Sequence, residues 1–256
     1  MSPPDQDPRA PGRAALWDVC PVESPPGHGI FGDGRPLRTP AGHLLAVPSA
    51  ALAAAIAAEL RAQVTFKAPI AAASQAAPKP PNVAAMPHLR LAATALDRVA
   101  AARDATIDGV AAYGETELLC YRAAGPAELV ERQQAVWQPL LDWAAARYDA
   151  LLLVHTGVMP QPQSPTALAA LRGAVAGHDD WLLTALAFAV QTSGSLVVGL
   201  ALAEGRLDAD QAFAAAELDE SYQIERWGED AEQAARRGQR RRDLRDAAEF
   251  MALYRN

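Results

Sequence analysis

Cysteine and aromatic residues are scarce in this chain. Its 256 residues include two cysteines, Cys20 and Cys120, and aromatic residues make up 6%. Two thiols are too few for a disulfide framework, a cysteine-based metal site or a CxxC redox pair, and they fit a reducing compartment. Half of the chain is hydrophobic, and alanine, the best helix former, dominates that half. The composition therefore favours helices over a β-sandwich.

Basic residues are also fewer than acidic residues. The chain has 30 acidic and 23 basic residues, which gives a formal net charge of -7. Phosphate binding needs a basic face, so this balance argues against nucleic acid as the main partner and against an anionic substrate. Residues 1–15 have neither the apolar core of a signal peptide nor the Arg-rich amphipathic pattern of a transit peptide. We therefore expect a cytoplasmic protein.

One stretch lacks charge altogether. Residues 181–203 hold no charged side chain and are long enough to cross a bilayer. However, residues 191–195 would place polar and small side chains in the middle of the membrane, and the flanks have little positive bias. We expect the central helix of a soluble bundle and no stable membrane insertion, with the small residues 193–195 allowing close helix approach. The alternative is a membrane-associated assembly factor.

The first part of the chain has the pattern of short strands. Between residues 16 and 48, apolar runs are separated by Pro- and Gly-rich turns such as Asp33-Gly34. Residues 37–39 are predicted to pair with residues 44–47. Ser49 is then the predicted N-cap of an alanine-rich helix that carries three apolar residues at i, i+4 and i+8: Leu52, Ile56 and Leu60.

Two domains are predicted on this basis. Residues 64–85 include four prolines that break any long helix, which is typical of a linker or insertion. Beyond Pro87, helices are predicted at 88–103, 105–113, 126–148 with a kink at Pro139, 165–176, 180–204, 208–227 and 230–254. Residues 151–165 leave room for a short strand. The predicted fold class is α+β: a small N-terminal β-rich domain with one helix and the linker (1–85), followed by a larger all-α helical domain (86–256).

Motifs for cofactor chemistry are missing. The five histidines are scattered and form no HExxH or HxH pair, so we expect no metal site. Residues 193–195 faintly resemble a nucleophile elbow but lack the second glycine and the preceding strand. The glycines of residues 32–34 indicate a turn, and no GxGxxG or P-loop motif is present. We therefore expect no cofactor.

The arginine cluster near the C-terminus, residues 236–242, could be an anion site. Acidic residues are interleaved with it at i,i+3 and i,i+4 spacing along one predicted helix. We expect a solvated, salt-bridged helix, although such a face can also dock a charged partner.

Residues 218–230, LDESYQIERWGED, concentrate carboxylates around aromatic and apolar side chains. On a helix, Glu225 shares a face with Leu218 and Tyr222, whereas Glu220 lies on the roughly opposite face. Each carboxylate would then sit in an apolar face and need a partner there. Gly228 is predicted to end the helix at its C′ position.

Three interpretations of this stretch compete. A catalytic pair needs a common cleft, yet Glu220 and Glu225 lie more than about 100° apart around the helix. A structural role would pair them with arginines such as Arg90, Arg98 or Arg122. A third role is a partner surface anchored by aromatic residues. The structural and partner roles both stay open. The catalytic alternative is a small-molecule hydrolase or lyase that uses clustered carboxylates together with His155.

Five ordered blocks of the chain resemble a known family: the assembly chaperones of the F-type ATP synthase catalytic head, which bind its free α subunit. The blocks are DGRPLRTPAGHLLAVPSAALAAAIAAE (33–59), MPHLRLAATALDRV (86–99), LLCYRAAGPAELVERQQAVWQPLLDWAAARY (118–148), SGSLVVGLALAEGRL (193–207) and LDESYQIERWGED (218–230). Leu60 stands where the family usually has Trp, the Pro/Ala-rich stretch after it is longer than usual, and the opening strand before Asp33 matches poorly.

The resemblance implies a β-rich N-terminal domain, a helical C-terminal domain and a non-enzymatic function. The chain would hold the unassembled α subunit soluble until that subunit joins β. The bacterial cytoplasm is the expected location, as is the mitochondrial matrix for eukaryotic relatives, and we expect a monomer when the protein is free. The residues that the resemblance implies for partner binding are Asp219, Glu220, Gln223, Glu225 and Trp227.

Overall fold

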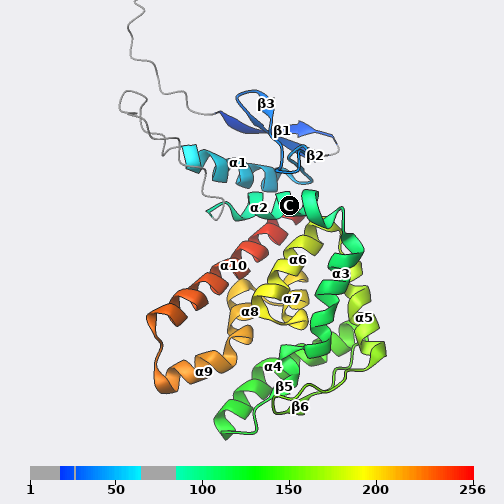
Figure 1. Ribbon diagram of the computed structural model, residues 1–256, viewed down its shortest axis with the longest axis vertical. Coiled ribbons are helices and arrows are strands. Elements are labelled where there is room, and N and C mark those ends of the chain that lie inside the picture. Colours follow the sequence, from blue (N-terminus) through cyan, green and yellow to red (C-terminus); the bar gives the residue numbers. More distant parts are fainter. Residues whose placement is uncertain (1–17, 26, 65–84) are drawn as a thin grey trace, which may run out of the picture. The chain divides into compact units, whose positions relative to one another are not determined.

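A computed structural model describes residues 18–25, 27–64 and 85–256 (Figure 1). A small antiparallel sheet with one helix comes first and a series of helices follows, so the predicted α+β class is confirmed. The chain separates into two compact units, residues 1–90 and 91–256. The sequence-based boundary lay at 85/86, inside this first unit. The predicted linker lies almost wholly outside the described residues.

Strand β2 is the centre of the N-terminal sheet. It pairs antiparallel with all three other strands: β1 (Val19–Ser24), β3 (Arg35–Pro36) and β4 (Ala46–Val47), while β2 itself spans Gly27–Gly32. The predicted turn at Asp33-Gly34 joins β2 to β3, with φ angles of 51° and 73°. Both residues lie in the left-handed region that tight hairpin turns require, which explains the Asp-Gly pair.

The pairing predicted for residues 37–39 and 44–47 is confirmed. Arg38 and Leu44 form an antiparallel bridge, and the Leu45 N–H donates to the Leu37 carbonyl at 2.9 Å. Helix α1 (Ala50–Val64) follows, and its predicted cap is also present, since the Ser49 hydroxyl accepts a hydrogen bond from the Leu52 N–H at 3.1 Å.

The predicted apolar face of α1 packs on strands β1 and β2. Leu52 and Ile56 are fully buried and Leu60 is almost so. Burial of each such side chain contributes about 1.5–3 kcal/mol, so this helix is what gives the small sheet its core.

Helices dominate the rest of the described chain. They are α2 (Pro87–Thr94), α3 (Arg103–Ala111), α4 (Ala127–Tyr148), α5 (Pro165–Ala176), α6 (Asp180–Ser193), α7 (Leu196–Ala203), α8 (Ala209–Ala216), α9 (Leu218–Trp227) and α10 (Ala231–Arg255). A π-helical turn (Ala95–Val99) and two 3₁₀ turns (Ala112–Thr116 and Leu118–Cys120) connect α2, α3 and α4. Strand β6 (His155–Thr156) pairs in parallel with β5 (Tyr121–Arg122), so the predicted short strand after α4 exists.

The single helix predicted at 180–204 is wrong, because α6 and α7 are separate helices. Gly194 ends α6 in the left-handed region at φ 72°, and the Ser195 hydroxyl caps α7 by accepting from the Val198 N–H at 3.0 Å. None of the described helices is both long enough and apolar enough to span a membrane. The close approach of α6 and α7 occurs at Gly199, where a Cβ would lie 2.4 Å from Val190 Cγ2, and not at Gly194, where a Cβ would meet nothing within 4 Å.

A buried carboxylate explains this break. Glu117 is fully buried and accepts hydrogen bonds from the Ser195 hydroxyl, the Leu196 N–H (2.8 Å) and the Val197 N–H (3.2 Å). Desolvation raises the pKa of Glu117, and these hydrogen bonds oppose that rise. The carboxylate satisfies the free N–H groups that begin α7. Ser195 is therefore a helix cap bonded to a carboxylate and not a nucleophile.

The helix predicted at 208–227 is also two helices. The backbone leaves helical geometry at Glu217, with φ -105° and ψ 22°, so that α9 starts in a new direction after α8. Glu217 is buried and its carboxylate lies 2.5 Å from an Arg240 nitrogen of α10. A charged partner on another helix stabilises this break, and periodicity along one helix cannot reveal it.

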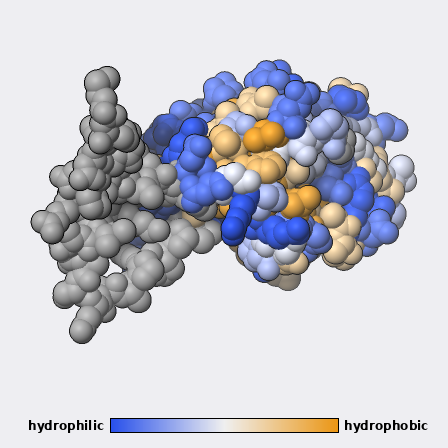
Figure 2. Space-filling view, turned by 90° about the horizontal axis from the view of Figure 1, so that it is seen from above, coloured by the Kyte–Doolittle hydropathy of each residue, from blue (hydrophilic) through white to orange (hydrophobic). Residues whose placement is uncertain are grey.

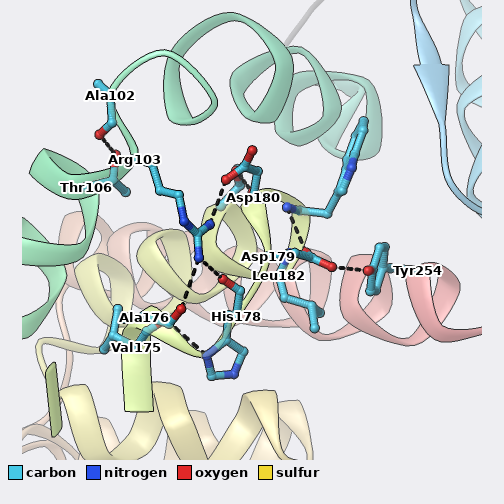
Figure 3. A network of polar contacts seen from close by, with 12 residues as sticks. Ala102, Arg103, Thr106, Val175, Ala176, His178, Asp179, Asp180, Leu182 and Tyr254 are labelled. Atoms are coloured by element: carbon cyan, nitrogen blue, oxygen red, sulfur yellow. Dashed lines mark hydrogen bonds and ion pairs between the residues drawn. The ribbon is translucent and has the colours of Figure 1, made fainter. Parts of the chain in front are cut away.

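Arg103 ties three helices together (Figure 3). Its guanidinium at the start of α3 donates to the carbonyls of Ala176 and His178 at the end of α5, at 3.0 and 2.5 Å. It also pairs with Asp180 at the start of α6, at 2.7 Å. The cation thus binds the negative end of one helix dipole and neutralises a carboxylate beside the next helix.

The last turn of α10 joins the same network. Asp179 caps α6 by accepting from the N–H groups of Trp181 and Leu182, both at 3.0 Å, and the Tyr254 hydroxyl donates to the other carboxylate oxygen. That hydrogen bond is the main reason why the pKa of Tyr254 rises to about 12. The last turn of α10 is thereby hydrogen-bonded to the start of α6.

Candidate partner-binding surface

Helix α9, which carries most of the LDESYQIERWGED stretch, packs against α4 (Figure 1). Tyr222 of α9 lies against Arg132 of α4 in this contact. Tyr222 is 3% exposed, and the guanidinium carbons of Arg132 and Arg226 lie 5.3 and 5.0 Å from its ring centroid. Cation–π contacts on the ring add to the apolar burial. Leu218, one turn earlier, is buried on the same face, as predicted.

Asp219 is held from within the protein. Its carboxylate accepts a hydrogen bond from the Gln133 side-chain amide of α4 at 2.8 Å. Gln133 is 1% exposed, and its other amide atom accepts from the Ala123 N–H at 2.8 Å. One buried side chain therefore links α9, α4 and the segment that follows β5.

Glu225 is exposed, contrary to its expected place in an apolar face. Its carboxylate lies 2.7 Å from an Arg132 nitrogen, with 52% of the Glu225 side chain accessible. Arg132 also binds Glu128, at 2.9 Å, and its pKa is raised chiefly by the hydrogen bond to Glu225. The partner is thus Arg132 and none of the arginines named from the sequence. An ion pair this exposed contributes little stability, so the pair can be given up to a partner protein.

Glu220 is half-buried and faces α10. Its carboxylate accepts a hydrogen bond from the Gln233 side chain, and Gln233 also donates its backbone N–H to Asp230, the N-cap of α10, at 2.8 Å. Within the described ranges, no arginine or lysine is paired with Glu220. The carboxylate is therefore hydrogen-bonded to Gln233 and forms no ion pair with a described arginine or lysine.

Gln223 and Trp227 point away from the core. Both are exposed, and Trp227 is 78% accessible. Among the large hydrophobic side chains exposed in the described chain, Trp227 is the one aromatic residue. Gly228 follows at φ 86° and ends α9, as predicted. An indole this exposed at a helix end, beside carboxylates, has the character of an anchor for another protein.

The arginine cluster of α10 is more than a solvated face. The predicted i,i+4 pairing occurs between Arg236 and Glu232, at 3.1 Å. Arg241 and Arg245, however, both reach 2.9 Å from Asp210 on α8, and these hydrogen bonds lower the pKa of Asp210. The sequence does not reveal these contacts because they depend on how α8 and α10 pack.

A model of the ATP12 chaperone protein family matches residues 16–145 of the chain. This match spans 130 of the 256 residues, more than half. The chain belongs to the ATP12 chaperone family. The resemblance seen in the sequence is thereby confirmed, and it gives the protein a chaperone role in ATP synthase assembly.

Solved structures support this ATP12-family membership. The chain is similar to Atp12 from Paracoccus denitrificans, with 40% identity and a TM-score of 0.82 over 93% of this chain and 97% of that one. A point mutant of the same Paracoccus protein gives the same identity and TM-score, with 96% of its chain covered. A protein from Agrobacterium tumefaciens, described as a candidate chaperone, is 34% identical, with a TM-score of 0.79 over 93% of this chain and 84% of its own.

Membership in a chaperone family implies that this ATP12-family protein is not an enzyme. The hydrolase alternative needed Glu220 or Glu225 within hydrogen-bond reach of His155, but those carboxylates bind Gln233 and Arg132. The His155 ring instead packs edge-on against Tyr121 at 4.6 Å, and neither of its buried ring nitrogens has a hydrogen-bond partner in the described chain. Neither Glu220 nor Glu225 therefore forms the carboxylate–histidine pair with His155 that this alternative needs. The described residues also contain no cluster of three or more metal-ligating side chains.

Proposed function

We propose that this ATP12-family chaperone binds the free α subunit of the F-type ATP synthase and prevents its aggregation until α pairs with β. The observation that carries the proposal is Trp227, an indole 78% exposed at the end of a helix that is itself firmly packed. The contact surface consists of Glu220, Gln223, Glu225 and Trp227, and Asp219 orients the helix that presents them.

The chemistry of this surface suits a temporary partner. An α subunit without its neighbour exposes a large apolar interface, which invites aggregation. Trp227 supplies an aromatic anchor for that interface, while Glu220 and Glu225 supply charge that governs partner choice and association rate. A mixed surface of this kind binds the α subunit tightly enough to block self-association of α and still releases α when the β subunit binds.

Preorganisation supports the same proposal. Tyr222 and the Gln133–Asp219 hydrogen bond hold α9 in place before any partner arrives. Binding then does not have to order the helix, which would cost conformational entropy. The bacterial cytoplasm is the proposed location, in keeping with the bacterial relatives, and the free protein is proposed to be a monomer.

The test uses purified α subunit and purified chaperone without ATP. We expect near-stoichiometric chaperone to suppress the light scattering of aggregating α, and Trp227→Ala to raise the dissociation constant at least about tenfold. Leu44→Ala is the matched control, because Leu44 is an apolar residue 51% exposed in the N-terminal unit. Failure of the unmodified chaperone to protect α would refute the proposed function.

A further inference from the structure

The segment that connects α4 to α5 is unusually poor in charge. Residues 150–171 contain no Asp, Glu, Lys or Arg, although charged residues make up 21% of the chain. Asp149 and Arg172 bound this stretch. Surface segments normally carry charge for solubility, so its absence over this length needs a reason.

Large apolar side chains are exposed within that segment. Leu151, Leu153, Val158 and Met159 are 77%, 52%, 87% and 72% accessible. Single exposed hydrophobic residues are ordinary, whereas four within nine positions form a patch of the kind that binds a protein. On the face seen in Figure 2, by contrast, apolar residues occur in small groups separated by hydrophilic ones.

Hydrogen bonds hold this segment in one conformation. The Gln163 side chain, 8% exposed, binds both backbone groups of Leu153: its oxygen accepts from the N–H at 2.7 Å and its nitrogen donates to the carbonyl at 3.0 Å. The Gly157 N–H donates to the Arg122 carbonyl of β5 at 3.0 Å. The apolar side chains are therefore held out toward solvent on a fixed backbone and not left to collapse.

The segment is joined to the elements that present Trp227. Arg122 of β5 lies over the Trp137 ring of α4, 5.5 Å from its centroid, and Gln133 of α4 links Ala123 to Asp219 of α9. Figure 1 shows β5, β6, the start of α4 and α9 at the same end of the helical unit. A partner bound at α9 would thus meet the apolar segment next.

We propose that residues 151–159 form a second contact surface for the client subunit, which takes an uncharged apolar face of the α subunit. This inference rests on the function proposed above and adds a separate site to it. The absence of charge in this segment determines which kind of partner face fits it. A charged partner face would lose its hydration here and gain no opposite charge in return. The charged α9 surface then steers association, and residues 151–159 supply apolar contact area.

The test compares a double substitution in the patch with a single control substitution elsewhere, both in the full-length chain. Val158→Ser with Met159→Ser removes the two most C-terminal apolar side chains of the patch, and both are exposed, so neither carries a core contact that folding needs. Val22→Ser is the control, since Val22 is apolar and 40% exposed in the N-terminal unit. Titration with purified α subunit should show a dissociation constant raised about tenfold or more in the double variant and by less than about twofold in the control.

Two further readouts identify the occupant. Because the contact is uncharged, the salt dependence of α binding should be the same in the double variant and the unmodified protein. A photo-crosslinking residue placed at position 158 should join to purified α subunit, and the same residue placed at position 22 should not. Equal affinity in the double variant would overturn the inference while the proposed function stands, whereas failure of the unmodified protein to bind α overturns both.

Other occupants give distinct outcomes. Sedimentation velocity that finds a dimer of the unmodified chain, lost in the double variant, would assign the patch to a second copy and refute the inference. Cosedimentation with phosphatidylglycerol vesicles, lost in the double variant, would assign it to a lipid surface and refute the inference as well.

Discussion

The Gln133 side chain donates a hydrogen bond across 2.8 Å to Asp219, 86 residues further along the chain. This bond joins α4 to α9, and the Gln133 side chain is buried there. It sets the orientation of the helix that carries Glu220, Gln223, Glu225 and Trp227, and it gives Asp219 a positioning role in the proposed surface.

Replacing Asp219 should weaken the fold before it weakens binding. Asp219→Ala leaves the buried Gln133 amide without its acceptor, so we expect the free energy of unfolding to fall by about 1–3 kcal/mol. Gln133→Leu combined with Asp219→Ala should cost less than the sum of the two single changes, because the two residues share one interaction. Urea unfolding measures both effects, and strictly additive losses would contradict this coupling.

Glu220→Lys should impair protection of the α subunit while leaving the protein folded. Glu220 makes one hydrogen bond, to Gln233, and is only half-buried, so a lysine can extend its ammonium into solvent. We expect the free energy of unfolding to change by less than about 1.5 kcal/mol, while protection of α subunit in light scattering is largely lost. Glu220→Gln, which has the same size without the charge, is the control. A collapse of the thermal unfolding temperature of Glu220→Lys would instead make Glu220 a structural residue.

Asp210 should make stability depend on pH. Hydrogen bonds from Arg241 and Arg245 lower its pKa in the folded state below the ordinary value of 3.8. The folded protein then binds its proton less readily than the unfolded chain, so the stabilisation is present above pH 3.8 and is lost as the pH falls through the lowered pKa. The urea midpoints of the unmodified protein and Asp210→Asn should therefore differ at about pH 6 and converge as the pH falls below 3.8. A difference independent of pH would show that the ion pairs do not stabilise the fold.

Gly199 should tolerate no side chain. A Cβ at this position would lie 2.4 Å from Val190 Cγ2 and 3.3 Å from Leu186 Cδ1, both in the core between α6 and α7. We expect Gly199→Ala to lower the free energy of unfolding by about 1–3 kcal/mol through overpacking. Gly173→Ala in α5 is the matched control, because a Cβ there meets nothing within 4 Å and should stabilise the helix by up to about 1 kcal/mol. Equal effects at the two glycines in chemical denaturation would contradict the packing argument.

The candidate surface shows how far sequence reasoning extends. The helical stretch, its end at Gly228 and the buried face with Leu218 and Tyr222 could be predicted, because each depends on residues within a few positions. The partners of its carboxylates could not be predicted. Arg132 and Gln133 lie on α4, far away in sequence, and only the packing of two helices brings them to Glu225 and Asp219.

Local chemistry in the sequence determined the α+β class, the Asp33-Gly34 turn and the Ser49 cap, since turn and cap preferences act over a few residues. Tertiary structure alone decided where the long predicted helices break. Gly194 and Glu217 end helices because a buried glutamate, Glu117, caps α7 and a distant arginine, Arg240, pairs with Glu217. Such contacts between residues far apart in the sequence form only after the chain has folded, so no periodicity in the sequence records them.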